Sequence, residues 1–208
     1  MKLYGDIRSG NCYKIVLLAH RLELPFAWQY LNILKSETQT AEFLSKNPNG
    51  KIPCLEIGNG TCLAESNAIL NYLADGTDFL PADKLRRAQV LQWQFFEQYS
   101  HEPFIAVARY IAKYLGLPAA RKAEYESKQA GGHKALAVME QQLKQTPYLV
   151  GDRYTIADIS LYAYTHVAHE GGFDLSSYPH INAWLQRVAA QPRHITMDQA
   201  EAEVAPSC

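Results

Sequence analysis

The sequence predicts two segments of different fold class, an α/β segment over 1–76 and an all-helical segment over 85–208. In the first, strand-like and helix-like patterns alternate in the order β-α-β-α-β-β-α, which implies a sheet covered by helices. In the second, apolar residues recur every three to four positions almost to Pro192, which is the spacing of helices. Residues 77–84 are expected to link the two.

The elements of the α/β segment are predicted from short local patterns. Pro25 ends the first helix, because proline disrupts a helix interior. Thr40 is suited to cap the second helix. The sequence Gly58-Asn59-Gly60 separates two apolar runs and favours a hairpin. The predicted strands lie at 2–4, 26–31, 54–57 and 61–63, and the helices at 12–22, 40–44 and 65–74.

The helical segment has three marked interruptions. Pro103 should kink the first long helix, because it donates no hydrogen bond and its ring crowds the preceding turn. Gly131-Gly132 is expected to loosen the second helix, and Gly171-Gly172 should close the third. The predicted helices cover 85–115, 121–145, 155–170 and 179–191, followed by a mobile tail over 198–208.

Two sets of polar residues in the helical segment invite a functional interpretation that we do not adopt. Thr155 and Asp158 have the spacing of a capping box, with Asp in place of the usual Glu. This position explains Asp158 fully. His166 and His169 flank a helical turn, but no third ligand converges on them, so no metal site is predicted.

Composition and charge narrow the classes of function. With 48% hydrophobic and 20% charged residues, the 208-residue chain has the composition of a globular protein. A net charge of −1 gives no general reason to expect a nucleic-acid or membrane partner. The first residues lack the apolar stretch of a signal peptide, so a cytoplasmic protein is expected. In that compartment free thiols are predicted for Cys12, Cys54, Cys62 and Cys208.

The first candidate site is residues 8–14, between a predicted strand and a predicted helix. A helix N-terminus stabilises anions, including thiolates. Ser9 and Asn11 offer hydrogen-bond donors there, and Cys12 offers a thiol. The alternative is that Ser9 or Asn11 only caps the helix and that Cys12 packs as a small apolar residue.

The second candidate is the turn at 47–55, which contains an Ile52–Pro53 bond. A cis proline would leave the backbone of Ile52 facing outward, ready to pair with an extended peptide. The alternative is an ordinary turn with a trans proline.

The third candidate is residues 64–67, at the start of a predicted helix. Ser66 and the helix N-terminus could bind the carboxylate of an α-amino acid, and Glu65 could bind its ammonium. The alternative is again a cap, with Glu65 favoured by the helix dipole. Each of the three signals is weak alone, whereas their order on the β-α-β-α-β-β-α framework makes them jointly specific.

On these residues the sequence resembles the glutathione transferase family, over most of its length. The resemblance implies a thioredoxin-like N-terminal domain, a helical-bundle C-terminal domain and usually a homodimer. Three stretches resemble the family's turn before its third strand, its glutathione motif and its C-terminal capping motif, namely residues 47–55, 63–69 and 151–159.

The resemblance also implies how glutathione, as cosubstrate, would be bound. The proline of the turn would be cis, and the backbone of Ile52 would pair with the cysteinyl part of glutathione. Glu65 and Ser66 would hold its γ-glutamyl end. Lys51, together with Lys35, would neutralise the glycyl carboxylate, which suits a cation on a flexible stem.

Family members place a Tyr, Ser or Cys after the first strand to activate the thiol. Ser9 is similar to the serine types, and Asn11 is similar to bacterial members in which an asparagine amide contacts the sulfur. Cys12 sits later than the cysteine of the cysteine types. We therefore place Ser9 and Asn11 close together as catalytic candidates, ahead of Cys12.

The electrophile is expected between the loop that contains Ser9 and the kinked helix at 99–112. Nearby aromatic residues could instead belong to the core or to a dimer interface. The predicted pocket residues are His101, Glu102, Ile105 and Arg109.

The leading prediction is a glutathione transferase that forms the thiolate for attack on small hydrophobic electrophiles, as in detoxification. A glutathione-dependent disulfide reductase would use the same site with a second glutathione. A dicarboxylate isomerase would need more cations than Arg8 and Arg109 provide. A binding protein that has lost catalysis is disfavoured by the intact Pro53, Glu65 and Ser66.

Overall fold

The structure is a computed structural model in which residues 1–204 are described. They form two compact units, residues 1–75 together with 192–204, and residues 76–191. The predicted division near residue 76 lies within one residue of the division after Asp75, whereas the predicted C-terminal domain is shared between both units. The predicted free thiol of Cys208 lies outside the described residues.

The first unit contains a four-stranded sheet in the spatial order β2-β1-β3-β4. β1 pairs in parallel with β2, whereas the β1–β3 and β3–β4 pairs are antiparallel. The element order confirms the predicted β-α-β-α-β-β-α arrangement. The strands are Lys2–Gly5 (β1), Ala27–Tyr30 (β2), Cys54–Glu56 (β3) and Cys62–Ala64 (β4).

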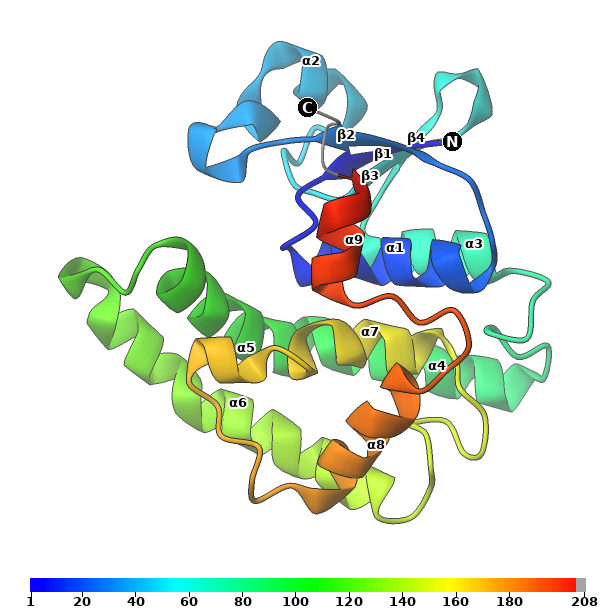
Figure 1. Ribbon diagram of the computed structural model, residues 1–208, viewed down its shortest axis with the longest axis vertical. Coiled ribbons are helices and arrows are strands. Elements are labelled where there is room, and N and C mark those ends of the chain that lie inside the picture. The colour runs from blue at the N-terminus through cyan, green and yellow to red at the C-terminus, as the bar shows by residue number, and fades with distance from the viewer. Residues whose placement is uncertain (205–208) are drawn as a thin grey trace. The chain divides into compact units, whose positions relative to one another are not determined.

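Helices cover both faces of this sheet. α1 and α3 lie side by side on one face, and α2 lies on the other (Figure 1). Tyr4 and Cys54, on neighbouring strands, pack with Phe43 of α2. Because side chains alternate along a strand, Leu3 and Leu55 face α1 and α3, and both are buried. The helices are Gly10–Arg21 (α1), Ala41–Lys46 (α2) and Ser66–Ala74 (α3), with short 3₁₀ turns at Ile33–Lys35, Glu37–Gln39 and Gly58–Gly60.

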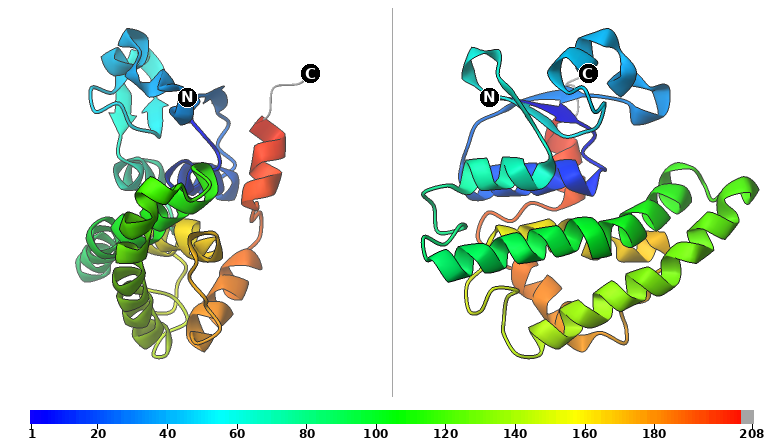
Figure 2. Two further views of the ribbon diagram at one scale, coloured as in Figure 1. Left: turned by 90° about the vertical axis from the view of Figure 1, so that its left-hand side faces the viewer. Right: turned by 180° about the vertical axis from the view of Figure 1, so that it is seen from behind.

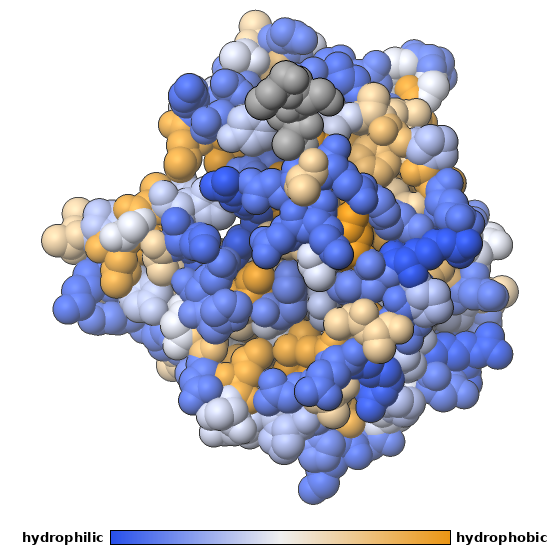
Figure 3. Space-filling view, viewed as in Figure 1, coloured by the Kyte–Doolittle hydropathy of each residue, from blue (hydrophilic) through white to orange (hydrophobic). Residues whose placement is uncertain are grey.

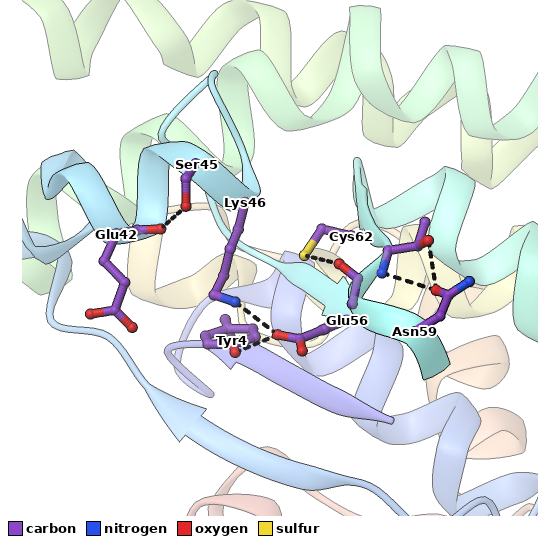
Figure 4. Close-up of polar contacts among 9 residues, drawn as sticks. Tyr4, Glu42, Ser45, Lys46, Glu56, Asn59 and Cys62 are labelled. Atoms are coloured by element: carbon purple, nitrogen blue, oxygen red, sulfur yellow. Dashed lines mark hydrogen bonds and ion pairs between the residues drawn. The ribbon is translucent and has the colours of Figure 1, made fainter.

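A polar contact joins the end of α2 to the sheet (Figure 4). The hydroxyl of Tyr4 donates to Glu56 Oε2 at 2.6 Å, and Lys46 Nζ lies 2.9 Å from the same oxygen. These two donors lower the pKa of the Glu56 carboxyl, while burial and the bond to Glu56 raise the pKa of Tyr4. Tyr4 therefore serves the packing of the first unit.

The C-terminal segment belongs to the first unit and contains a helix where a mobile tail was predicted. This helix, α9, covers Met197–Val204, and Figure 3 shows that its outward face is hydrophilic. Just before it, the hydroxyl of Tyr13 in α1 donates to the carbonyl of Ile195 at 2.7 Å. The predicted tail therefore contains a helix in its described part, whereas its residues 205–208 lie outside the described residues. The sequence gives little sign of the helix because it has few apolar residues; the buried ones within α9 are Met197 and Ala200.

The second unit begins with the predicted kinked helix. Pro103 lies near the start of α5, where its missing N–H is not needed. The preceding π-helical turn is wider than an α-helical one, so it makes room for the ring. The successive parts are Lys84–Phe96 (α4), a π-helical turn at Glu97–His101, Glu102–Arg109 (α5) and a second π-helical turn at Tyr110–Tyr114.

α6, Lys122–Leu143, follows a 3₁₀ turn at Ala119–Arg121 and packs against α5 (Figure 2). It runs without interruption through Gly131-Gly132, so the predicted loosening is wrong. The rings of Phe104 and Phe173 occupy the places where the two Cβ atoms would stand. Close packing of aromatic rings, rather than flexibility, explains this glycine pair.

α7, Ile156–Thr165, is buried along its whole length. Its predicted capping box is confirmed, because the amide of Thr155 donates to the carboxylate of Asp158 at 2.9 Å. The helix ends earlier than predicted, and a 3₁₀ turn at Ala168–Gly171 follows it. α8, Pro179–Ala189, packs against α6 and α7. No helix within residues 1–204 is long and apolar enough to cross a membrane.

Candidate active site

The first predicted site forms at the N-terminus of α1. The carbonyl of Ser9, the N-cap residue, accepts hydrogen bonds from the amides of Cys12 and Tyr13 at 3.0 and 2.9 Å. The Ser9 hydroxyl makes no capping bond and instead contacts the thiol of Cys12. Ser9 thus starts the helix through its backbone and keeps its hydroxyl at the positive end of the helix dipole.

Cys12 is enclosed in the first unit, with 0% of its surface exposed. Burial raises the pKa of its thiol to about 12, although hydrogen bonds to the backbone of Asp6 and to the side chain of Ser9 act in the opposite direction. An enclosed thiol that stays protonated at neutral pH is a poor nucleophile. The geometry favours the alternative in which Cys12 packs as a small apolar residue.

Asn11, which is half-buried, belongs to a polar network with the buried Lys14 and Ser66 that sequence reasoning missed. Its Oδ1 accepts hydrogen bonds from Lys14 Nζ at 2.7 Å and from the Ser66 hydroxyl at 3.1 Å. Lys14 Nζ also lies 3.2 Å from Ser66 Oγ. Lys14 is 0% exposed, which is rare for a lysine. The available sequence signal was that Lys14 interrupts the apolar run from Cys12 to Ala19.

The turn before β3 is anchored by the buried side chain of Asn47, whose Nδ2 donates to the carbonyl of Lys51 at 2.7 Å. The Ile52–Pro53 peptide bond is cis. Among residues 1–204, neither the amide nor the carbonyl of Ile52 forms a hydrogen bond. This backbone is therefore open to pairing with an extended ligand.

Glu65 has an unusual backbone conformation, with φ 65° and ψ 113°. A positive φ strains a residue other than glycine, and such strain is concentrated at binding and catalytic sites. Its carbonyl accepts a hydrogen bond from the amide of Ile69 at 3.0 Å, so Glu65 precedes the first turn of α3. Its exposed side chain therefore stands at the positive end of that helix.

The structure brings the three predicted stretches to one end of the sheet. Pro53 and Glu65 flank the β3–β4 pairing at the same end of the hairpin. Ser66, the next residue, contacts Asn11 of α1. The two lysines predicted to bind a carboxylate are both exposed, Lys51 in the turn directly before Ile52 and Lys35 in the 3₁₀ turn after β2.

The four predicted electrophile residues lie on the first π-helical turn and on α5 of the second unit. His101 is fully buried, and its Nε2 lies 2.9 Å from Thr165 Oγ1. Arg109 is 3% exposed and donates from Nε to Glu170 at 2.6 Å. Ile105 is also buried, which leaves Glu102 as the partly exposed member.

These contacts give His101, Ile105 and Arg109 a role in packing the helical unit rather than in presenting a surface to a substrate. Sequence spacing placed them on one stretch of helix but did not tell its buried side from its open side. Within residues 1–204, no group of three or more His, Cys, Asp or Glu side chains could hold a metal ion.

Comparison with known proteins identifies the family of the chain. Models of the glutathione S-transferase N-terminal and C-terminal domains match residues 1–75 and 93–192. The crystal structure of a glutathione S-transferase from Pseudomonas fluorescens is similar, with a TM-score of 0.93 and 66% identity over 94% of this chain and 98% of that chain.

Two curated relatives match over most of their lengths. Glutathione S-transferase 1 of Schizosaccharomyces pombe is 30% identical over 91% of each chain. The disulfide-bond oxidoreductase YfcG of Escherichia coli is 29% identical over 88% of each chain. From its two domains, its fold and these relatives, the chain belongs to the glutathione S-transferase family.

Proposed function

We propose that this enzyme binds glutathione in the first unit and converts its thiol to the thiolate for attack on small electrophiles. The observation that carries the proposal is the meeting of three features at one end of the sheet. These are the N-terminus of α1 with Ser9 and Asn11, the open backbone of Ile52, and the Glu65–Ser66 start of α3.

Each part of glutathione has a chemical partner in this arrangement. Ser66 and the amides at the start of α3 suit the γ-glutamyl carboxylate, and Glu65 suits the ammonium group. The backbone of Ile52 suits the cysteinyl part, which is itself an extended peptide. The exposed Lys51 and Lys35 supply positive charge for the glycyl carboxylate.

The chemistry requires stabilisation of a thiolate. A free thiol has a pKa of about 8.5, so only a few per cent is ionised at neutral pH. Lowering that pKa by about two units needs ~2.7 kcal/mol. Hydrogen bonds to a charged sulfur, each worth roughly 1.5–3 kcal/mol, together with the dipole of α1, are sufficient. Ser9 and Asn11 are the donors that we assign; the proton leaves to solvent, and the sulfur then attacks the electrophile.

A titration of bound glutathione tests this proposal. Thiolate absorbance in the ultraviolet is followed against pH for the wild type, Ser9→Ala and Asn11→Ala, with the exposed Asn59→Ala as the matched control. The wild type and the control should show a lowered thiol pKa, and at least one site variant should raise it. An unlowered pKa in the wild type would refute the proposal. Absence of saturable binding would favour the non-catalytic alternative.

A glutathione-dependent disulfide reductase is the second candidate, favoured by the similarity to the disulfide-bond oxidoreductase of Escherichia coli. The glutathione thiolate would attack a disulfide, form a mixed disulfide and expel one thiolate. Because Cys12 is enclosed, a second glutathione would have to resolve the mixed disulfide, which yields oxidised glutathione and the second thiol. Comparing kcat/KM for a chloronitrobenzene with kcat/KM for a mixed disulfide distinguishes the two reactions.

We also propose that the chain is a homodimer and works in the cytoplasm, where thiols are kept reduced. The support for a dimer is a set of large apolar side chains left exposed on α4 and the π-helical turn after it. Large apolar side chains that are exposed near one another mark protein interfaces. Sedimentation of the wild type should give twice the mass of the chain. The exposed residues are Leu85, Phe95 and Tyr99, at 67%, 62% and 82%.

A further inference from the structure

We propose that Lys14 is a positioning residue that fixes the orientation of the Asn11 amide, so that Nδ2 rather than Oδ1 is directed to the glutathione sulfur. The inference rests on the proposed function, since it assigns a role at that same site. It comes from the buried contact among Lys14, Asn11 and Ser66 rather than from any motif.

The hydrogen-bonding capacity of each group identifies the atom of Asn11 that faces Lys14. A lysine ammonium has only donors, so the Asn11 atom that lies 2.7 Å from Lys14 Nζ must be the amide oxygen. The Ser66 hydroxyl donates to the same oxygen at 3.1 Å. Oδ1 therefore accepts both of these hydrogen bonds, and Nδ2 is the other end of the same amide group.

Ser66 alone would not fix this orientation of the Asn11 amide. A hydroxyl donates or accepts equally well, so it could bond to either end of the Asn11 amide. With Lys14 present, a turned amide would set N–H donors against a buried ammonium. That arrangement would set donors against each other and deprive the Lys14 ammonium, which is 0% exposed, of its acceptor on Asn11. Lys14 is thus the member of the network that discriminates between the two orientations.

The orientation of the Asn11 amide affects the ionisation of the glutathione sulfur. Nδ2 donates hydrogen bonds to a thiolate and so stabilises the anion. If the amide turned, Oδ1 would face the thiolate, and repulsion between the two would favour the protonated thiol. Lys14 therefore acts on the thiol pKa through Asn11, without itself touching the substrate.

A competing role for Lys14 must be separated from this one. Because Nζ lies 3.2 Å from Ser66 Oγ, the lysine could instead strengthen binding of the γ-glutamyl carboxylate at Ser66. That role predicts weaker binding of every glutathione derivative, whereas the positioning role predicts a change in thiol ionisation alone.

The experiment uses the variants Lys14→Met and Lys14→Arg. Methionine fills the space without a donor. Arginine keeps a group with donors only. Lys46→Met is the matched control, because Lys46 lies in the same unit but contacts Glu56. The thiol pKa of bound glutathione and the affinity for S-methylglutathione, which has no ionisable thiol, are measured for each.

The expected result is a rise in the thiol pKa of about one unit in Lys14→Met, which is about tenfold less thiolate below the pKa. Lys14→Arg should retain a lowered pKa, and S-methylglutathione should bind all variants like the wild type. A pKa in Lys14→Met as low as in the wild type would overturn the inference. Loss of S-methylglutathione binding without a pKa change would also overturn it, in favour of the carboxylate role.

A failure of the inference differs from a failure of the proposed function. If the wild type lowers the thiol pKa and Asn11→Ala raises it while Lys14→Met does not, only the role of Lys14 is refuted. If the wild type does not lower it, the proposed function falls, and the role of Lys14 falls with it.

A measurement on the wild type applies if Lys14→Met does not fold. The Nδ2 hydrogens of Asn11, identified by their absence from Asn11→Asp, should show nuclear Overhauser effects to the methyl group of bound S-methylglutathione. Contacts of these hydrogens with the β-hydrogens of Ser66 instead would overturn the inference.

Discussion

Each unit of the molecule buries a charged side chain among hydrogen-bond partners near a helix N-terminus, Lys14 in the first unit and Asp158 in the second. The two differ in whether those partners lie at the candidate site. Asp158 accepts bonds from the amides of Leu149 and Thr155, both at 2.9 Å, and from the indole of Trp184 at 3.0 Å. None of these three donors belongs to the candidate site. Lys14, in contrast, bonds to the polar side chains of Asn11 and Ser66, at the end of the sheet where the candidate site lies.

The comparison teaches that a buried charge does not by itself mark either stability or function. The carboxylate in α7 is enclosed from all sides, so its contacts hold segments of the helical unit together. In our proposal, the ammonium in α1 instead orients groups that bind glutathione. Removing the Asp158 carboxylate should therefore lower the free energy of unfolding. Removing the Lys14 ammonium should instead raise the thiol pKa of bound glutathione.

The largest effect is expected for Asp158→Ala. Four buried donors, which are the amides of Leu149 and Thr155, the Thr155 hydroxyl and the Trp184 indole, would lose their acceptor. The free energy of unfolding should therefore fall by about 3–5 kcal/mol. Urea denaturation measures this change. Asp152→Ala, at an exposed position six residues earlier, is the matched control and should stay close to the wild type. A loss below about 1 kcal/mol would mean that the carboxylate does not hold the unit together.

The next effect is expected at the other cluster, for Asn11→Ala. The thiol pKa of bound glutathione should rise by about one to two units, because the sulfur loses a charge-assisted donor. The free energy of unfolding should change by less than about 1 kcal/mol, since Lys14 keeps Ser66 as a partner. Absorbance titration and urea denaturation on the same samples separate the two effects. A fall in stability with an unchanged pKa would reverse the comparison.

A smaller effect is expected from the pH dependence of Asp158. Burial raises its pKa to about 6, outweighing the hydrogen bonds that the carboxylate accepts. The unfolded chain has a pKa of about 3.9, so the folded state binds the proton more tightly. Stability from this group is therefore gained as pH falls through about 6, by about 1 kcal/mol between about pH 7 and about pH 5.

Carbon-13 titration of the Asp158 carboxyl, with urea denaturation of the wild type and Asp158→Asn at both pH values, measures this dependence. The wild type should gain stability relative to the variant at the lower pH. A carboxyl midpoint below about 4 would show that the hydrogen bonds, and not burial, dominate.

The smallest effect is expected at an exposed ion pair, which unlike Asp158 and Lys14 is not buried. Arg8 Nη2 lies 2.8 Å from Glu201 Oε1 of α9, and both side chains are largely open to solvent. Arg8→Ala should lower the free energy of unfolding by less than about 0.5 kcal/mol, and salt should weaken the wild-type contact. Thermal unfolding at low and high salt tests this, and a larger loss would show that α9 depends on the pair.

Local sequence patterns predicted those features of the fold that depend on residues close together along the chain. The order of strands and helices, the cap at Thr40 and the capping box at Asp158 were all confirmed, because each is decided within a few positions along the chain. The same reasoning misjudged Gly131-Gly132 and the segment now known as α9. In both cases the deciding contact comes from a residue distant in the sequence.

The candidate site divides in the same way. The motifs located Ser9, Asn11, Pro53 and Glu65, since a turn, a helix start and a cap have recognisable sequences. They ranked Cys12 below Ser9 and Asn11 only by its place along the chain, because the burial that raises its thiol pKa arises only when α1 packs in the folded unit.

By itself, the sequence determined the fold class, the family and the stretches proposed to form the site, because these follow from periodicity and short motifs. Tertiary structure alone decided which side chains are enclosed and what they face. Lys14 is the clearest case. In the sequence it interrupts an apolar run, and only the packing of α1 against α3 brings its ammonium to both Asn11 and Ser66. The physical reason is that burial and hydrogen-bond partnership are properties of three-dimensional contact, which residue spacing does not encode.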